Sequence, residues 1–427
     1  MAIDVPSQMT LPRASAWRDM RFCDLRAGGH VEEQEGLLLA QKAENDARSS
    51  MRTVEPSQPC ARTDAVPIKV LNICETAKGG PASYFLVLER STADMATHVF
   101  LVPDAHAQDL ELESEILDFR DPGRSFRRLF RLLIAASRAM RTVEPDVVFF
   151  HSTFTLPIML VLRAFFASGR FIYCAHGWAA ERYGKGTAKR RLVSLIEGTL
   201  AGISDVVVNI SQTDQLYATS SHYLGRHHLI ENAVLDVTCR RTGNRVNADD
   251  KTLDLLFVGR FDYQKGVDLL LEAFSRVALM RDDIRLHLVG APVVTQSPLA
   301  MRELEHPRIV EHGWLKADQL QARYAEADLV IVPSRWEGFG LVVAESFRAG
   351  TPVMVSDRGA LPGLVEQSRT GFVVPLSVGD LVKALSALSL EELAGMRRAC
   401  RRTYEERFHS DRFGAQMKQL LQDLVAR

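Results

Sequence analysis

The stretch that decides the fold lies in the C-terminal third of the chain and reads Pro333-Ser334-Arg335-Trp336-Glu337-Gly338-Phe339-Gly340-Leu341-Val342-Val343-Ala344-Glu345-Ser346-Phe347. An apolar run at 329–332 comes before it and predicts a buried parallel strand. A helical pattern from Leu341 to Arg348 follows, and glycine and proline end it. The glycines Gly338 and Gly340 therefore fall at a strand-to-helix turn, where backbone N–H groups and the helix dipole favour an anion. Glu337 and Glu345 stand on either side of that anion site.

Strands and helices alternate over most of the remaining chain. A first series of strands is predicted at 68–73, 97–102, 146–151, 171–174, 205–210 and 228–230, and a second at 255–258, 285–289, 308–312, 329–332, 352–355 and 371–374. Strands separated by helices predict parallel, doubly wound sheets. We therefore expect an α/β protein with two Rossmann-like domains facing across a cleft, with ligands at the carboxyl ends of the strands.

Changes in composition mark the boundaries between these parts. Residues 1–65 are polar and have no core-forming period, which predicts a flexible extension. The first domain is expected at 66–238, a polar linker at 239–252 and the second domain at 253–407. Residues 408–427 form a separate C-terminal helix.

Overall composition excludes several classes of protein. The net charge of the 427 residues is −1 and the pI is about 6.9, which argues against nucleic acid as a partner. The six cysteines include no Cys-x-x-Cys, which argues against structural zinc and for a reducing compartment. No apolar run is long enough to span a bilayer, and the N-terminus has no apolar signal region. A cytoplasmic location is the expectation.

A second motif precedes the first and supports the same interpretation of the site. It reads Leu256-Phe257-Val258-Gly259-Arg260-Phe261-Asp262-Tyr263-Gln264-Lys265-Gly266. Together the two stretches resemble the Gly-Arg-x4-Lys-Gly and Glu-x7-Glu motifs of retaining glycosyltransferase family 4, which has the GT-B fold. The resemblance runs from roughly Ile68 to the C-terminus. It implies a nucleotide-diphosphate-sugar donor, a saccharide or lipid-linked acceptor, no cofactor and no metal ion, and a last helix that crosses back to the first domain.

The basic pair Arg260 and Lys265 is the candidate for binding the diphosphate, with Gly259 beside it. Arginine offers planar bidentate donors and lysine a point charge, and both stabilise the charge that the leaving nucleoside diphosphate gains. The ordinary alternative is a solvated pair at a helix start.

The two glutamates have different expected partners. Glu337 is the candidate for the donor sugar hydroxyls, and Glu345 resembles the family's ribose-binding glutamate. The ordinary alternatives are a first-turn glutamate that complements the helix dipole and a charge on an exposed face. Backbone N–H groups of Gly340, Leu341 and Val342 are expected to donate to the phosphates. The expected donor-binding turn is Gly338, Phe339, Gly340, Leu341 and Val342.

Two turns of the first domain complete the candidate site. Gly79 and Gly80 follow the first strand and let the backbone approach a ligand closely. His176 follows a later strand and resembles the family's histidine near the transferred sugar, although a lone histidine is more often structural. Asn232 matches the family's Asn-Gly-Val only in part, and Gly363 stands where the family has glutamate.

The segment Arg124–Arg141 is basic and amphipathic. An ordinary helix packed on the sheet accounts for its apolar residues, and contact with anionic lipid at the inner leaflet is the alternative.

The expected activity is retaining, metal-independent sugar transfer with Glu337, Arg260, Lys265 and His176 as catalytic residues. Family analogy points to cell-surface polysaccharide or lipopolysaccharide biosynthesis. Two alternatives stay open: a nucleotide-sugar 2-epimerase of the same fold, and a non-catalytic nucleotide-sugar-binding or scaffold protein.

Overall fold

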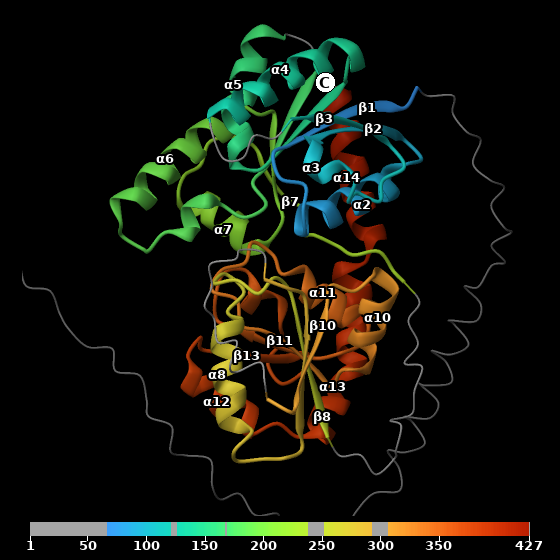
Figure 1. Cartoon of the computed structure of the whole chain (residues 1–427). Helices are drawn as coiled ribbons and strands as arrows, with labels where there is room; N and C mark the ends of the chain where they lie inside the picture. Colours follow the sequence, from blue (N-terminus) through green and yellow to red (C-terminus); the bar gives the residue numbers. More distant parts are fainter. Residues whose placement is uncertain (1–65, 121–125, 167–168, 238–251, 293–305, 427) are drawn as a thin grey trace, which may run out of the picture. The chain divides into compact units, whose positions relative to one another are not determined.

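The computed structural model describes residues 66–120, 126–166, 169–237, 252–292 and 306–426, which form two parallel sheets flanked by helices (Figure 1). The extension predicted at 1–65 and almost all of the linker predicted at 239–252 lie outside the described residues. The two sheets confirm the predicted α/β architecture with two Rossmann-like domains.

The first sheet has the strand order β3-β2-β1-β4-β5-β6-β7, with every pairing parallel. Its strands are β1 (Ile68–Cys74), β2 (Ala96–Pro103), β3 (Glu115–Phe119), β4 (Val147–His151), β5 (Arg170–Cys174), β6 (Val206–Asn209) and β7 (His227–Leu229). The order reverses between β1 and β4, so this is the topological switch point where such sheets bind ligands. The sequence did not predict β3, because this short edge strand pairs only with β2 and its two charged residues, Glu115 and Asp118, interrupt the apolar run.

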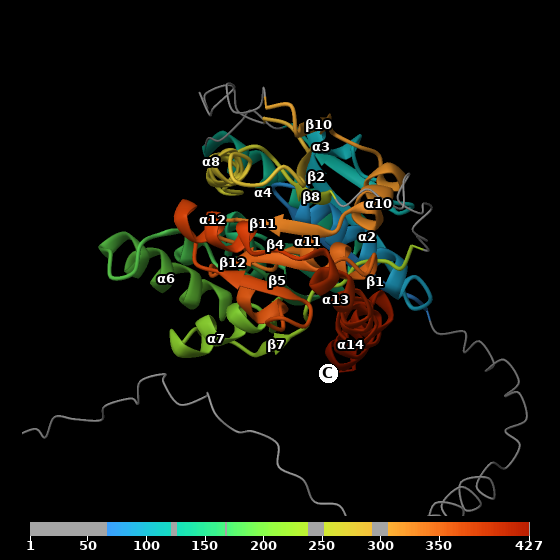
Figure 2. The same cartoon turned by 90° about the horizontal axis from the view of Figure 1, so that it is seen from below.

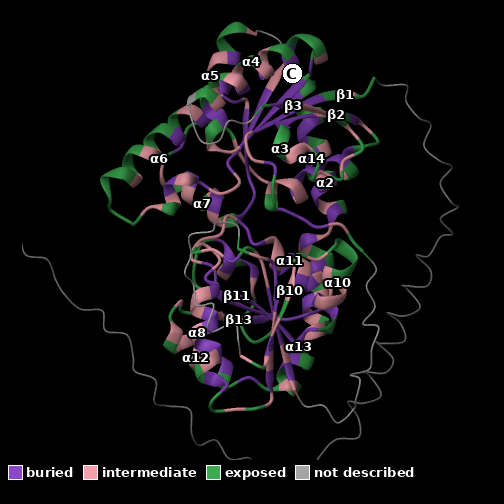
Figure 3. Ribbon diagram, viewed as in Figure 1, coloured by how far each residue is buried: buried purple, intermediate pink, exposed green. Residues whose placement is uncertain are grey.

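Helices cover both faces of this sheet and leave their outer surfaces exposed (Figure 3). They are α2 (Gly80–Thr92), α3 (Asp104–Ala107), α4 (Phe126–Val143), α5 (Leu156–Phe165), α6 (Ala188–Ala201) and α7 (Gln212–Ser220), with short 3-10 turns η1 (Thr153–Thr155) and η2 (Ala179–Arg182). Side chains of Thr187 and Ser211 cap α6 and α7 by accepting a backbone N–H in the first turn.

The second sheet has the order β10-β9-β8-β11-β12-β13 and is also parallel. Its strands are β8 (Leu253–Val258), β9 (Ile284–Val289), β10 (Ile309–Gly313), β11 (Leu329–Val332), β12 (Val353–Ser356) and β13 (Gly371–Val374). The described helices are α8 (Val267–Val277), α10 (Ala317–Glu326), α11 (Leu341–Arg348), the 3-10 turn η3 (Leu361–Leu364), α12 (Val378–Ser386) and α13 (Leu390–Thr403). Strand β11 leads into α11 through the glycine turn.

The last helix, α14 (Ser410–Val425), leaves the second sheet and packs against α2 of the first (Figure 1 and Figure 2). Lys418 pairs with Asp94 at 2.7 Å, and the Phe413 ring meets the Tyr84 ring edge to face at 5.4 Å between centroids.

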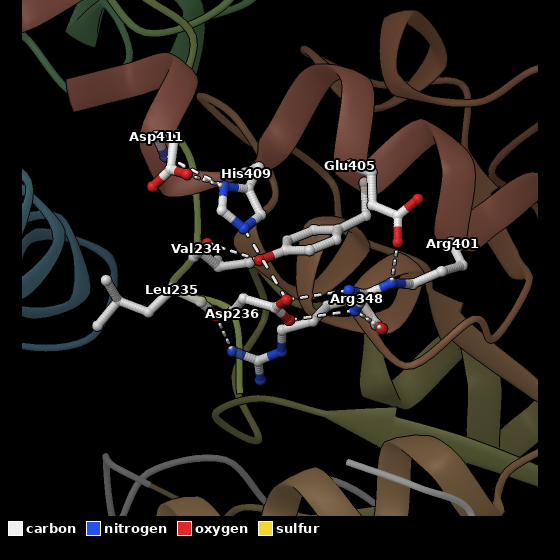
Figure 4. A network of polar contacts seen from close by, with 9 residues as sticks. Val234, Leu235, Asp236, Arg348, Arg401, Glu405, His409 and Asp411 are labelled. Carbon is white, nitrogen blue, oxygen red and sulfur yellow. Dashed lines mark hydrogen bonds and ion pairs between the residues drawn. The ribbon is translucent and has the colours of Figure 1, made fainter. Parts of the chain in front are cut away.

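The chain also crosses between the sheets earlier, after β7. Polar contacts join this crossing to the one that leads into α14 (Figure 4). A π-helical turn, Tyr404–Phe408, forms the crossing into α14, and its Phe408 carbonyl accepts the Val234 N–H at 3.0 Å. Arg401 donates to both carboxylate oxygens of Asp236 at 3.1 and 3.0 Å. The two crossings are therefore one connected unit.

Candidate functional site

Three turns at the carboxyl ends of strands lie together. A Cβ atom added to Gly338, in the turn before α11, would lie 2.8 Å from both the Gly177 Cα and the His176 carbonyl oxygen after β5. A Cβ atom added to Gly80, after β1, would lie 3.8 Å from Leu341 of α11. Backbone of the first sheet therefore contacts the turn that the sequence predicts to bind an anion. Only glycine allows the approach at Gly338, because any side chain there would overlap the opposite backbone.

The Lys265 and Glu337 side chains meet at this turn. The Lys265 ammonium lies 2.5 Å from Glu337 Oε1, and the Ser334 hydroxyl donates to the same oxygen at 2.9 Å. The two side chains are only 19% and 10% exposed, so solvent screens their attraction less than it would a surface pair. A lysine from the loop after β8 and a glutamate from the loop after β11 are thus fixed beside the start of α11.

Arg260 lies in the same loop as Lys265 but has other partners. Its guanidinium is 3.1 Å from Asp262 Oδ2 and donates to Gln264 Oε1 at 3.1 Å. Gln264 in turn donates to the Trp336 carbonyl at 3.2 Å, which ties this loop to the Glu337 turn. The structure therefore brings Lys265 and Glu337 into direct contact, whereas Arg260 of the same loop contacts Asp262 and Gln264.

The turn at 338–342 combines a buried side chain with backbone N–H groups that have no partner within the helix. Phe339 is buried, and its ring packs edge to face on Phe408 at 5.8 Å, so its side chain belongs to the core. The first backbone N–H groups of α11, including those of Leu341 and Val342, have no partner within the helix by the geometry of any α-helix. Such groups can donate to an anion, which is the role that the sequence predicts for them.

Glu345 is anchored from a neighbouring helix. Its Oε2 accepts a hydrogen bond from the Tyr324 hydroxyl of α10 at 2.6 Å. Burial raises the pKa of Tyr324 well above its usual value, and the nearby Glu345 carboxylate acts in the same direction. Tyr324 therefore stays a neutral donor and orients the carboxylate.

The loop after β12 supports Glu337 through its backbone. Ala360 N–H donates to the Glu337 carbonyl at 3.0 Å, and a Cβ atom added to Gly359 would lie 2.4 Å from that carbonyl oxygen. Gly359 also has a φ of +57°, so both its conformation and its surroundings require glycine.

His176 ends a chain of buried polar side chains that runs through the first sheet. Its Nε2 lies 3.0 Å from His151 Nδ1, whose other ring nitrogen lies 3.3 Å from Asn72 Oδ1. The chain continues at 3.1 Å from Asn72 Nδ2 to His98 and at 2.8 Å from His98 to Thr92. The Thr92 hydroxyl then donates to a backbone carbonyl one turn earlier in α2, at 2.7 Å.

The donors and acceptors of this chain fix its tautomers. Asn72 Nδ2 also approaches the Val99 carbonyl at 3.4 Å, so the amide oxygen of Asn72 faces His151 and accepts its Nε2–H. His151 Nδ1 must then accept, and His176 Nε2–H donates to it. The neutral His176 ring therefore keeps Nδ1 as an acceptor.

Burial keeps these imidazoles neutral. It lowers the pKa of both His98 and His176 to about 4 and holds the pKa of His151 well below its usual range. His176 also has a φ of +54°, unusual for a residue with a side chain and typical of functional turns.

The sequence analysis missed Asn72, His98 and His151 as functional candidates. Their signal was polar residues inside otherwise apolar strands, which are buried in the structure. Ser334 and Tyr324 carried no sequence signal, because only the fold brings them to the glutamates.

The described ranges contain no cluster of three or more histidine, cysteine, aspartate or glutamate side chains suited to a metal ion. No helix in these ranges combines the length and apolar character needed to cross a bilayer.

Comparison with known proteins gives a family match over part of the chain and a shared fold. Residues 252–390 match the model of the family described as Glycosyl transferases group 1. The chain is 26% identical over 352 residues to a 41.2 kDa protein of the cps region of Klebsiella pneumoniae, covering 80% of this chain and 96% of that one. It is 27% identical over 280 residues to glycogen synthase of Mycobacterium tuberculosis, covering 64% and 66%.

Solved structures share the two-sheet architecture. Sucrose-phosphate synthase from Thermosynechococcus elongatus superimposes with a TM-score of 0.73 at 20% identity, over 84% of this chain and all of that one. Alr3699/HepE of Anabaena, in complex with UDP-glucose, gives 0.67 at 18% identity, over 83% and 100%. The family model covers residues 252–390 alone, and the solved structures show that this chain shares their two-domain GT-B fold.

Proposed function

We propose that this chain is a retaining glycosyltransferase that moves a sugar from a nucleotide-diphosphate sugar to a saccharide or lipid-linked acceptor. One observation carries the proposal: the Lys265–Glu337 pair lies at the N-terminus of α11, in contact range of the first sheet's glycine turn. A fixed cation, free helix N–H groups and a carboxylate in one place suit a phosphate joined to a polyol.

Each candidate residue has a role in this proposal. Lys265, Arg260 and the first N–H groups of α11 bind the diphosphate and stabilise its growing charge. Glu337 accepts hydrogen bonds from the donor sugar hydroxyls, and Glu345, oriented by Tyr324, accepts one from the ribose. The protein cations take the place of a divalent ion, so transfer proceeds without metal.

The reaction exchanges one bond at the anomeric carbon for another. The bond from the anomeric carbon to the phosphate oxygen breaks, and the bond to the acceptor hydroxyl oxygen forms on the same face. The acceptor proton passes to the leaving phosphate oxygen. No carboxylate is assigned as a nucleophile on the far face, which distinguishes this route from double displacement.

The biological role follows from one relative. The Klebsiella pneumoniae protein, whose length this chain nearly spans, lies in a cps region. We infer a role in the biosynthesis of a cell-surface polysaccharide or lipopolysaccharide.

The test is release of nucleoside diphosphate by the purified full chain. UDP-, GDP- and ADP-sugars are compared with and without a membrane extract, beginning with UDP-glucose, the ligand of the Anabaena structure. Glu337→Ala and Lys265→Ala are each expected to lower the rate by about 10²–10³-fold. Lys383→Ala, at an exposed lysine of α12, is the matched control and keeps the rate.

The outcomes separate the alternatives. Release that rises with extract, persists with EDTA and falls in both site variants supports the proposal, and the anomeric coupling of the product reports its configuration. Product without acceptor indicates a 2-epimerase. Donor binding without release by any extract indicates a scaffold protein. An inverted product overturns the retaining route.

A further inference from the structure

Helix α6 turns its apolar stripe toward solvent. Leu192, Leu195 and Ile196 are 58%, 68% and 48% exposed, and their spacing places them on one face of the helix. A surface helix ordinarily buries such a stripe against the sheet and exposes its polar side. Here the side turned to the protein includes the buried residues Glu197, Gly198 and Ala201.

Polar contacts hold α6 in this orientation. The Glu197 carboxylate accepts the Thr153 hydroxyl at 2.7 Å and the backbone N–H groups of Ala179 and Ala180 at 3.0 and 2.9 Å. The Tyr223 hydroxyl donates to Ser194 at 3.0 Å. Rolling the helix to bury its leucines would break these bonds and leave buried polar groups unpaired.

The stripe lies beside concentrated positive charge. No acidic residue occurs between Arg182 and Ile196, whereas this short segment contains five basic residues: Arg182, Lys185, Lys189, Arg190 and Arg191. All of them except Arg190, which is half-buried, are exposed. An exposed apolar stripe with cations on the same helix matches the two attractions that bind a helix to an anionic bilayer.

Helix α4, where the sequence leaves lipid contact open as the alternative to an ordinary helix packed on the sheet, is covered differently. Its residues Leu132, Ala136, Ala139 and Met140 are buried in the core of the first sheet, and Arg124 lies outside the described residues. Lipid contact by α4 stays a prediction. On α6, by contrast, all three apolar residues of the stripe are exposed.

We propose that the surface made of Leu192, Leu195 and Ile196 of α6 and the five basic residues in and just before this helix docks on an anionic lipid bilayer. The chain reaches α6 directly from the His176–Gly177 turn through η2, so docking would bring a membrane-held acceptor toward the candidate site. This link to an acceptor rests on the proposed transfer function, whereas bilayer binding itself does not.

The test is sedimentation of the full chain with vesicles of phosphatidylcholine alone or of phosphatidylcholine with phosphatidylglycerol in equal parts. We expect binding only to the anionic vesicles, weakening as salt rises. Lys185→Gln with Arg191→Gln should weaken it about thirtyfold, from about 1 kcal/mol for each charge. L192S/L195S/I196S should weaken it at least roughly tenfold.

Matched variants keep the proposal falsifiable. Leu279→Ser with Met280→Ser removes exposed apolar side chains next to α8 and should not change vesicle binding. Phe130→Ser with Ile134→Ser does the same on α4. Thermal unfolding midpoints show that every variant is folded.

Several outcomes would overturn the docking proposal. They are absence of binding to anionic vesicles, unchanged binding by both α6 variants, or loss confined to the α4 variant. A dimer that L192S/L195S/I196S converts to monomers would assign the stripe to a second copy of the chain. Because these measurements need no donor sugar, vesicle binding without transfer would refute only the proposed function.

Discussion

His176 Nε2 donates to His151 Nδ1 at 3.0 Å, and the two rings are stacked with centroids 5.2 Å apart. His151 thereby decides which nitrogen of His176 carries the proton. The ring nitrogen that remains an acceptor can receive a hydrogen bond from a sugar hydroxyl.

Replacing His151 with phenylalanine keeps a ring of similar shape and removes this restraint. We expect His151→Phe to lower kcat by roughly tenfold to a hundredfold with little change in donor affinity, because hydrogen-bond orientation of His176 is lost. The nitrogen-15 shifts of His176 should change from one tautomer to a mixture.

The second sheet supplies a matched control for this experiment. His287 Nδ1 and His312 Nε2 are also 3.0 Å apart with stacked rings, on β9 and β10 of the second sheet. His287→Phe should leave kcat and the His176 signals unchanged. An unaltered tautomer in His151→Phe would contradict the positioning role.

The hydroxyl of Ser334 restrains the Glu337 carboxylate at 2.9 Å. A hydrogen bond to a charged group contributes about 1.5–3 kcal/mol, so Ser334→Ala should lower kcat/KM by roughly tenfold to a hundredfold. Ser356→Ala is the control, because Ser356 donates to the Ser334 carbonyl rather than to Glu337. Steady-state kinetics with both variants decide the point, and equal losses would assign Ser334 to packing alone.

The approach between Gly177 and Gly338 leaves no room for a methyl group. Gly338→Ala should therefore push the two turns apart and lower kcat/KM by about tenfold or more, with a loss of stability of about 1–3 kcal/mol from overpacking. Gly363→Ala, where an added Cβ meets nothing within 4 Å, should change neither quantity. Donor kinetics and denaturant unfolding measure the two effects, and wild-type activity in Gly338→Ala would show that the contact opens freely.

The buried imidazoles predict how stability depends on pH. The folded pKa of His98 is about 4, below the ordinary value of 6.5, so the unfolded chain binds more protons between these values. The stability that His98 contributes is complete above pH 6.5 and is lost as pH falls toward 4.

Buried carboxyls act in the opposite direction and must be separated from this effect. Burial raises the pKa of Asp214 well above its usual range, so protonation of that group in the folded state favours folding at acid pH. Urea unfolding of the protein and of His98→Gln at pH 7 and pH 5 isolates the histidine, since the carboxyls are common to both. We expect the stability difference to shrink at pH 5, and a constant difference would contradict a neutral buried His98.

Local patterns predicted most of the fold because buried parallel strands are continuous apolar runs, as Leu329–Val332 shows, and because α11 begins and ends at glycines. The edge strand Glu115–Phe119 carries no such run and escaped prediction. Motif spacing indicated Lys265 and Glu337, but it carried no information on their direct contact. That contact, like the chain of polar side chains from Thr92 to His176, depends on which strands become neighbours. No local segment of the sequence determines the strand order.

The paired crossings between the sheets have a mechanical consequence. Because Arg401 donates to both carboxylate oxygens of Asp236, a displacement of one crossing beside the π-helical turn is transmitted to the other. The two connections between the sheets are therefore coupled through side chains as well as through the backbone bond from Val234 to Phe408.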